Sequence, residues 1–378
     1  MRSCLYGAAM SNLPVIDWMA LTLVPGLGSK TIWQLVNRFG GVQSVFSACA
    51  GGQKKAVNIR ESVFASLANP GPLRENAAFY LQNLHAHGGR AVCPDDSSYP
   101  ELLQETVNPP PVLYVQGRIE LLNSECVAMV GSRAATGYGR RSAFALARDL
   151  AASGVTVVSG LALGVDSEAH SGALAANGAT IGVLGCGLDV VYPRQNHDLY
   201  TQIRKHGLLV SEYLPGTRPE GFRFPARNRI IAGLSRGVVV VEAARKSGSL
   251  ITAELALEEG REIFAVPGQI DSFKSCGTHW LLQQGAKLVQ SADDILVELN
   301  NGWKGRENSE EGQPHLSSVN IDPEALAFLQ VIDVYPCPRN ELIASSGLGP
   351  AKVTELLLLL EMEGTVEILP GDQVRRIL

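Results

Sequence analysis

The middle of the chain alternates short apolar segments with longer segments of helical periodicity. The apolar segments are CVAMVG at 126–131, VTVVSG at 155–160, TIGVLG at 180–185, LLVSEY at 208–213, VVVVE at 238–242, IFAVPG at 263–268 and AKLVQ at 286–290. Because they are almost continuously apolar, we expect strands that are buried on both faces. The pattern predicts an α/β protein with a doubly wound, mostly parallel sheet. Ligands of such sheets bind outside the carboxyl ends of the strands, so we expect a site in the loops that follow them.

Two smaller regions precede this core. Residues 11–85 are predicted to form a small helical domain, with a tight turn at 24–28 (VPGLG) before an amphipathic helix at 30–39. The turn is typical of a helix-hairpin-helix, whose backbone amides grip DNA phosphates, and equally of an ordinary connection between two helices. The stretch 92–117 is rich in proline and predicts an extended lead-in to the sheet.

The composition changes abruptly after residue 300. Residues 301–318 are polar and turn-rich, which predicts a linker. Residues 319–378 predict a winged-helix-like domain. Its helices are expected at 323–333, 339–345 and 350–363, followed by hairpin strands at 366–369 and 373–377.

Composition excludes several classes of protein. The chain has 378 residues and a formal charge of −5, so any nucleic-acid site must be local and cannot be a general basic coat. No segment approaches the roughly 18 to 20 consecutive apolar residues of a membrane helix, and we expect a cytoplasmic protein that binds no membrane. The seven cysteines form no C-x-x-C pair, which argues against a disulfide framework and a zinc site. We expect neither a metal site nor a cofactor.

The loop after the first strand is a candidate phosphate site. Gly131, Ser132 and Arg133 lead into a helix start, where unpaired amides make phosphate a natural occupant. The G-x-G-x-x-G fingerprint is missing, so a nicotinamide dehydrogenase is not indicated. The sequence GLGSKT at 26–31 lacks a glycine directly before Lys30, so it does not encode a P-loop. No nucleophile–histidine–acid arrangement can be drawn, and we assign no catalytic residue and expect no enzyme.

Asp166 and His170 lie on one face of the helix that follows the second strand. Asp166 is placed to cap that helix, and His170 comes one turn later. Because no third ligand is near, we expect His170 to pack and form local hydrogen bonds instead of binding a metal.

The most polarised segment spans residues 218–236. It has five arginines against one acid, Glu220, with Phe222 and Phe224 between them. Arginine forks bind phosphates and aromatic rings stack on bases, so the segment predicts a platform for single strands. The alternative is a helix start with a solvated basic face and core phenylalanines. A second anion cradle is predicted at residues 246–249 (KSGS), where a serine caps a helix, glycine frees its amides and Lys246 adds charge.

Several motifs together resemble the DNA-processing protein A family, also called Smf. They are VGSR at 130–133, SGLALGVD at 159–166 with Ala169 and His170, GCGLD at 185–189 with Tyr192, Pro193 and Asn196, SEY at 211–213, FPARNRII at 224–231, and KSGSLITA at 246–253 with VPG at 266–268. The resemblance is strong over residues 90–300 and implies an extended Rossmann-like DNA-binding domain there. A helical N-terminal domain and a C-terminal winged helix are also common in the family.

The resemblance implies a homodimer that binds single-stranded DNA in natural transformation (competence) and DNA recombination. Such a protein protects the incoming strand and helps to load the RecA recombinase onto DNA coated by single-strand-binding protein. It implies no catalytic turnover. The predicted DNA-binding residues are Gly131, Ser132, Arg133, Asn196, Arg223, Phe224, Arg227, Asn228, Arg229, Lys246, Ser247, Gly248 and Ser249.

Two other functions, a nucleotide-binding enzyme and a transcription factor, are compatible with parts of the sequence. A nucleotide-binding enzyme that cleaves nucleotide–sugar bonds in small molecules would place Glu242 or Glu254 near the glycine-rich loops. That enzyme requires a closed pocket, whereas the arginine and phenylalanine segment favours an open groove. A transcription factor would depend on the winged helix alone, whose helix at 350–363 has one lysine against three glutamates, a poor composition for contacting phosphates.

Overall fold

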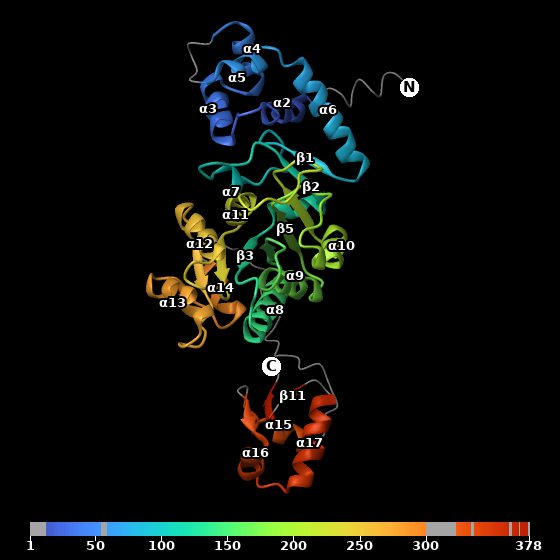
Figure 1. The fold of residues 1–378 in the computed structure, drawn as a ribbon, viewed down its shortest axis with the longest axis vertical. Coiled ribbons are helices and arrows are strands. Elements are labelled where there is room, and N and C mark those ends of the chain that lie inside the picture. Colours follow the sequence, from blue (N-terminus) through green and yellow to red (C-terminus); the bar gives the residue numbers. More distant parts are fainter. Residues whose placement is uncertain are drawn as a thin grey trace. The chain divides into compact units, whose positions relative to one another are not determined.

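The computed structural model of the protein describes residues 13–53, 59–299, 323–333, 336–362, 365–369 and 371–376 (Figure 1). The chain divides into two compact units, Met1–Lys304 and Gly305–Leu378. The linker expected at 301–318 lies outside the described residues.

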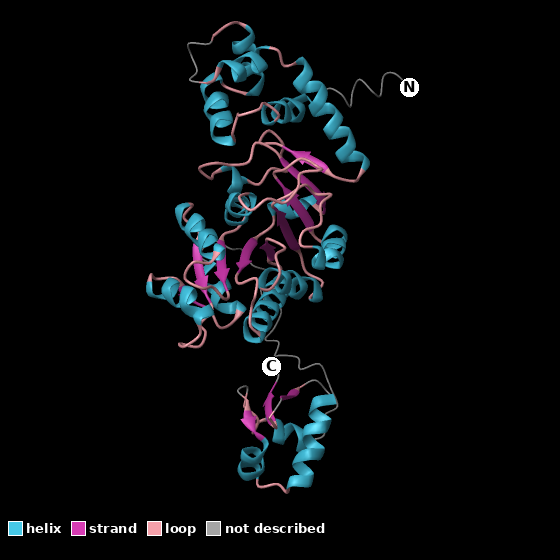
Figure 2. Cartoon of the chain, in the orientation of Figure 1, coloured by secondary structure: helices cyan, strands magenta, loops and turns pink. Residues whose placement is uncertain are grey.

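The larger unit is built around a nine-stranded sheet (Figure 2). Its strand order is β1-β2-β6-β5-β4-β3-β7-β8-β9. From β6 to β9 all neighbours are parallel, whereas β2 pairs antiparallel with β6 and β1 with β2. The predicted mostly parallel sheet is confirmed. The strands are β1 (Arg90–Val92), β2 (Leu113–Gly117), β3 (Cys126–Val130), β4 (Thr156–Ser159), β5 (Thr180–Leu184), β6 (Leu208–Ser211), β7 (Gly237–Val240), β8 (Glu262–Ala265) and β9 (Lys287–Leu288).

Helices cover both faces of the sheet, which explains why the strands are continuously apolar. Successive residues of a strand point to opposite faces, and Val127 and Ala128 of β3 belong to two separate hydrophobic cores. The core around Val127 is completed by α8 (Gly137–Ala152), α9 (Val165–Ala175) and α14 (Ala292–Leu299), and the core around Ala128 by α11 (Arg223–Gly233), α12 (Gly248–Glu258) and α13 (Cys276–Gln283). The sheet is therefore doubly wound, as expected.

The N-terminal helices share a core with one end of the sheet. Trp18 and Phe46 belong to the same buried cluster as Tyr114 of β2 and Tyr200 of α10 (His197–His206). Trp18 Nε1 also donates to Asp95 Oδ2 at 2.8 Å. The helical region expected at 11–85 thus packs on the sheet through a continuous core. Its helices are α2 (Leu13–Thr22), α3 (Ser29–Phe39), α4 (Val42–Ala50), α5 (Glu61–Ala68) and α6 (Gly71–Ala86).

Among its described residues, the smaller unit has three helices and a three-stranded sheet of order β10-β12-β11. Its core includes Phe328, Leu342, Leu356 and Val374, and the arrangement is that of a winged helix, as predicted. Its elements are α15 (Pro323–Leu329), β10 (Cys337–Pro338), α16 (Arg339–Ser346), α17 (Pro350–Met362), β11 (Val366–Leu369) and β12 (Gln373–Arg376).

No single helix in the described part of the chain is long and apolar enough to cross a membrane. Only α16 and α17 taken together pass that test, and they are bent by 112° at the break between them. Apolar side chains of both helices belong to the core of the smaller unit.

Candidate functional site

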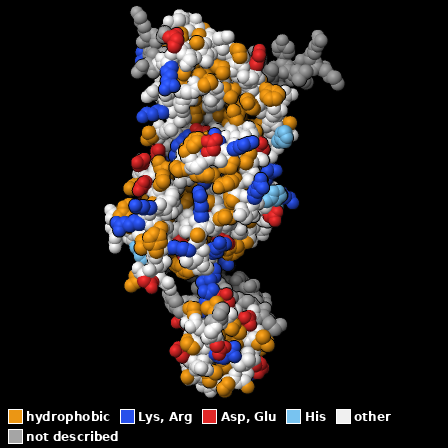
Figure 3. Space-filling model, viewed as in Figure 1, with side chains coloured by type: hydrophobic (Ala, Val, Ile, Leu, Met, Phe, Trp, Pro, Cys, Tyr) orange, Lys and Arg blue, Asp and Glu red, His pale blue; other side chains and the backbone are white. Residues whose placement is uncertain are grey.

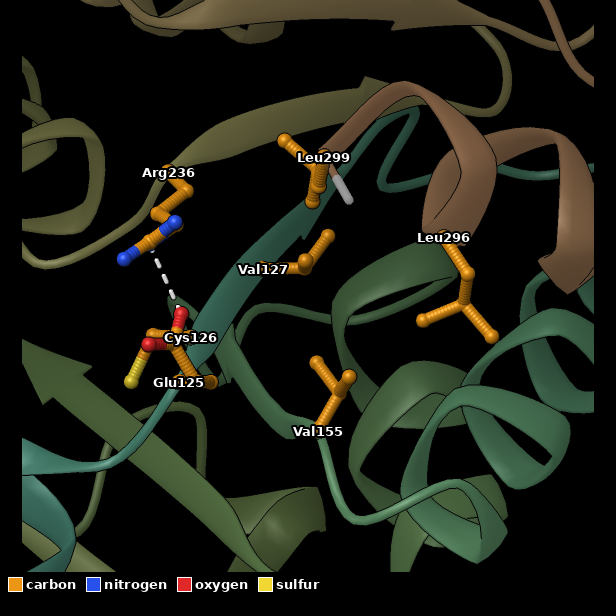
Figure 4. Close-up of a pocket in the computed structure, with 7 residues that line it drawn as sticks. All are labelled: Glu125, Cys126, Val127, Val155, Arg236, Leu296 and Leu299. Carbon is orange, nitrogen blue, oxygen red and sulfur yellow. Dashed lines mark ion pairs between the residues drawn. The ribbon is translucent and has the colours of Figure 1, made fainter. Parts of the chain in front are cut away.

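A small pocket at the amino end of β3 offers no room for a ligand (Figure 4). Leu296 and Leu299 of α14 line it, beside the ion pair between Arg236 and Glu125 at 2.7 Å. Its volume is about 10 Å³, which is space for about one water molecule. The carboxyl ends of the strands lie at the opposite edge of the sheet.

The sheet topology marks one point on that edge. The chain runs outward from β3 through β4, β5 and β6, and then returns to the other side of β3 with β7, β8 and β9. Loops on either side of such a reversal separate and leave a crevice at the carboxyl ends of the strands. The loops concerned follow β3 and β7, and they contain Arg133 and Lys246, two of the predicted DNA-binding residues.

Glu242 ties these two loops together. Its carboxylate accepts hydrogen bonds from Thr136 N at 2.9 Å and from Thr136 Oγ1. Thr136 in turn caps α8 by accepting from Gly139 N at 3.0 Å. The side chain of Glu242 is buried. It therefore acts as a structural link between the loops, and it is not poised as a free carboxylate.

Glycines allow the loop after β4 to approach the loop after β3. Gly164 has φ of +83°, and a Cβ at that position would overlap the carbonyls of Ser132 and Arg133. The amide of Val165 donates to Ser132 O at 3.2 Å. A residue with a side chain at 164 would therefore displace the segment that presents Arg133.

Arg133, Phe224 and Tyr192 form an aromatic platform at this edge. The guanidinium of Arg133 lies over the Phe224 ring, 5.5 Å from its centre. The Tyr192 ring stacks on the Phe224 ring, with 5.3 Å between the ring centres and an angle of 29° between the ring planes. A Cβ on Gly185 would lie 2.9 Å from the Phe224 ring, so the loop after β5 supports it closely. Arg133 is exposed, and Tyr192 is 43% exposed.

A second aromatic and cationic group lies at the start of α11. The Arg223 guanidinium lies 5.2 Å from the centre of the Tyr213 ring and 5.3 Å from that of Phe222. Arg223 also forms an ion pair with Glu220 at 3.3 Å. Phe222 is 68% exposed, so it is not one of the core phenylalanines that the alternative interpretation of this segment required.

Arg227 lies beneath the surface of the edge. Its side chain is only 4% exposed, and its guanidinium donates to Gly160 O at 2.7 Å and to Val183 O. Burial lowers the pKa of Arg227 from its ordinary value, against the favourable charge of Asp166. Because its guanidinium is hydrogen-bonded to backbone carbonyls, Arg227 positions the loop after β4 from below and does not present its charge to solvent.

Asp166 and Asn196 hold the same loop. Asp166 Oδ2 accepts from Gly160 N at 3.1 Å and from Ala162 N at 3.4 Å. Asn196 Nδ2 donates to Leu161 O at 2.9 Å. Burial raises the pKa of Asp166, and the Arg227 charge opposes that shift. Asn196 was predicted to bind DNA, but the structure places its buried amide against the backbone.

Two more of the predicted DNA-binding residues, Arg229 and Asn228, have side chains bonded to the protein. Arg229 pairs with Glu212 and donates to Asn108 O at 2.7 Å, so both terminal nitrogens of its guanidinium are bonded to the protein. Asn228 Nδ2 donates to Gly248 O at 3.3 Å and joins α11 to the second predicted cradle.

The loop after β7 keeps the features of an anion cradle. Ser247 caps α12, its hydroxyl accepting from Ser249 N at 3.4 Å. Ser249 is buried, whereas Lys246 and Gly248 are exposed. In the described part of the chain neither Arg133 nor Lys246 forms an ion pair. Both charges are thus available to a ligand.

His170 is buried away from the edge, as expected for a locally bonded histidine. Its Nδ1 lies 2.7 Å from Thr180 Oγ1, and burial lowers its pKa to about 3. The described residues contain no cluster of His, Cys, Asp or Glu that could hold a metal ion.

Charge is distributed locally on the surface. Lys and Arg side chains are scattered over the face shown in Figure 3, without a continuous basic coat. This distribution agrees with the net charge of −5.

Sequence reasoning missed the aromatic partners of the site. Tyr192 and Tyr213 were noted within motifs, but neither was assigned a role. Their signal is an aromatic residue in a loop that directly follows a buried strand. The contacts that make them part of the site join distant segments, and only the folded chain shows them.

Two regions of the chain match known families. The family described as DNA recombination-mediator protein A matches residues 90–300, and the DprA winged helix domain matches residues 312–372. Protein Smf of Synechocystis is 34% identical over 402 residues, covering 97% of this chain and 100% of Smf.

Two solved structures are also similar. The X-ray structure of DNA processing protein A (DprA) from Streptococcus pneumoniae has 40% sequence identity and a TM-score of 0.56, and covers 72% of this chain and 98% of that chain. DNA processing protein A from Helicobacter pylori, described for its single-stranded DNA binding mode, has 34% identity and a TM-score of 0.52, and covers 57% of this chain and 97% of its own.

The sheet order and the three-stranded C-terminal unit define a doubly wound α/β protein with a C-terminal winged helix. The chain belongs to the DNA recombination-mediator protein A family, as the match over residues 90–300 and the full-length similarity to protein Smf show. The resemblance drawn from the motifs is thereby confirmed.

Proposed function

We propose that this protein binds single-stranded DNA at the carboxyl edge of its sheet, in recombination and natural transformation. The observation that carries the proposal is the aromatic platform, in which the exposed Arg133 lies over Phe224 and Phe224 stacks on Tyr192. Aromatic faces accept unpaired bases of any sequence, and guanidinium groups hold the phosphates between them. The relative from Helicobacter pylori is described as binding single-stranded DNA, which supports the proposal.

The binding surface proposed here has two parts. Arg133 and Lys246, which form no ion pair among the described residues, supply positive charge, and Tyr192, Phe222 and Phe224 supply stacking surfaces. Arg223 pairs with Glu220 and packs against Phe222. Gly131, Ser132, Ser247, Gly248 and Ser249 supply the loops that bring backbone amides to the phosphates. Asn196, Arg227, Asn228 and Arg229 are assigned to positioning these loops, because their side chains are bonded to the protein.

Finer parts of the proposal depend on the family resemblance. They are a homodimer, protection of the incoming strand, loading of the RecA recombinase onto DNA coated by single-strand-binding protein, a cytoplasmic location and the absence of catalytic turnover. The functional division into a helical domain at 11–85, a DNA-binding domain at 90–300 and a winged-helix-like domain at 319–378 is part of the same proposal. The alternative enzyme is disfavoured by the use of Glu242 as a link between loops.

Affinity measurements at several salt concentrations test the proposal. A labelled single-stranded oligonucleotide is titrated with the full chain, with the matching duplex as competitor. We expect tighter binding to the single strand, little sequence preference and a linear fall of log affinity with log salt. Tighter binding to the duplex, or affinity that is indifferent to salt, would overturn the assignment.

A further inference from the structure

A large cavity lies between α6 and α10, and it shares no lining residue with the aromatic platform. Its volume is about 520 Å³, which falls in the size range of small-molecule sites. One wall is the face of α6 that carries Tyr80, Asn83 and Leu84, and another is formed by Arg204 near the end of α10. The loops after β5 and β6 close the cavity with Leu188 and Pro215.

One positive charge at the cavity has no acidic partner among the described residues. Arg204 is exposed and forms no ion pair among the described residues. The carboxylate that shares the cavity, Asp189, accepts hydrogen bonds from Gly216 N through both oxygens, at 2.8 and 3.0 Å. Asp189 keeps its negative charge, but the Gly216 amide holds it and it forms no ion pair with Arg204.

Arg204 also has a simpler structural role, which is to interact with the dipole of α10, and a test must separate this role from ligand binding. Arg204, Lys205 and His206 all lie in the last turn of α10, where positive charge favours the helix dipole. Only Arg204 of these three lines the cavity. Lys205 therefore serves as a control that shares the dipole effect and lacks the cavity.

The remaining lining suits a flat, partly apolar group with polar edges. The half-buried Tyr80 ring and the side chains of Leu84 and Leu188 give apolar surface. The amide of Asn83 on α6 and the imidazole of His87, the residue after the end of α6, also line the cavity. His87 Nδ1 is engaged with Asn83 O at 2.8 Å, which leaves Nε2 for a ligand. A nucleobase has this combination of a flat face and hydrogen-bonding edges.

We propose that the cavity between α6 and α10 binds a nucleoside phosphate, with the phosphate on Arg204 and the base against Tyr80. The same chemistry can come from a free mononucleotide or from one nucleotide of a bound single strand. The second source connects to the platform through one loop, because the loop after β5 lines the cavity with Leu188 while Gly185, in the same loop, supports Phe224. In that case the site rests on the proposed function.

Two titrations of the full chain distinguish the sources. In the first, fluorescent deoxyadenosine monophosphate is added to a protein that carries Arg133→Ala, so that the platform is weakened. In the second, thymidine oligonucleotides of increasing length are added to the chain with Arg133 intact. Each titration compares the parent chain with its variants Arg204→Ala, Arg204→Glu and the control Lys205→Ala. Equal melting temperatures first show that the variants are folded.

We expect Arg204→Ala to weaken binding about tenfold, as for one charge-assisted contact, and Arg204→Glu to weaken it further. Lys205→Ala should stay within about twofold of its parent. Dependence on Arg204 in the mononucleotide titration identifies free nucleotides as the ligand. Dependence only for the longer oligonucleotides identifies the bound strand. Equal effects of Arg204→Ala and Lys205→Ala in both titrations overturn the proposal. A chain that binds no oligonucleotide refutes the proposed function, but the mononucleotide titration still decides this site.

Discussion

The guanidinium carbon of Arg133 lies 5.5 Å from the centre of the Phe224 ring. Arg133 comes from the loop after β3 and Phe224 from the first turn of α11. The contact holds a mobile, charged side chain against a rigid aromatic face at the carboxyl edge of the sheet. Under the proposed function, a base that stacks on this group meets a positive charge already placed for its phosphate.

Arg133→Ala should weaken binding to a single-stranded oligonucleotide about tenfold, because one charge-assisted phosphate contact is lost. The slope of log affinity against log salt should become shallower by about 0.7. Fluorescence anisotropy at several salt concentrations measures both quantities. The matched control is Arg148→Ala, which removes an exposed arginine that pairs with its neighbour Asp149 on α8. Equal slopes for the two variants would contradict the assignment.

Phe224→Leu and Tyr192→Leu should each cost roughly 1 to 3 kcal/mol of binding free energy, because each removes a stacking surface. Neither side chain is charged, so the salt slope should stay at its original value. This difference separates stacking from phosphate contact in the same anisotropy experiment. A steep change of the salt slope in either variant would argue against a stacking role.

Arg227→Met should destabilise the fold by about 3 to 5 kcal/mol, since it leaves the buried Asp166 carboxylate without its positive neighbour. Chemical denaturation measures this loss. Asp166→Asn in the same background should recover part of the stability, because it removes the unpaired charge. An Arg227→Met chain that is as stable as the original and binds DNA weakly would instead place Arg227 in direct contact with the strand.

Gly164→Ala should destabilise the protein and weaken DNA binding together. Its positive φ and the nearby carbonyl of Ser132 leave no space for a Cβ. Gly349→Ala is the control, because Gly349 has no positive φ and nothing within 4 Å of a Cβ position. Thermal unfolding of the two variants, followed by oligonucleotide binding, measures both effects. Equal stability of the two variants would show that the loop tolerates a side chain.

His170 should make the protein less stable as pH falls below 6.5. Its pKa is about 3 in the folded protein against an ordinary value of 6.5, so near pH 5 the unfolded chain binds a proton that the folded chain does not. The stability is complete above pH 6.5 and falls by about 1.4 kcal/mol per pH unit between 6.5 and 3. Denaturation of His170→Asn at pH 7.5 and 5.5 should show a smaller loss than the original chain. Parallel losses in the two chains would rule out this histidine as the source.

The sequence alone predicted much of the fold and part of the site. Continuously apolar segments indicated strands covered on both faces, and the sheet is doubly wound. Arg133 and Lys246 were predicted at the carboxyl edge because they directly follow strands, and both are exposed there. These inferences depend on local order along the chain, which a sequence displays directly.

Only the tertiary structure separated the arginines of α11 from one another. Arg223 lies between aromatic rings, whereas Arg227 is buried against the loop after β4 and Arg229 pairs with Glu212. Helical spacing says which residues share a face, but it does not say which distant carbonyl or carboxylate faces them. The sequence thus determined that cationic and aromatic residues gather in the loops after the strands. Packing between distant segments decided which of them point to solvent and which hold the loops in place, because burying a charge requires partners that the fold alone supplies.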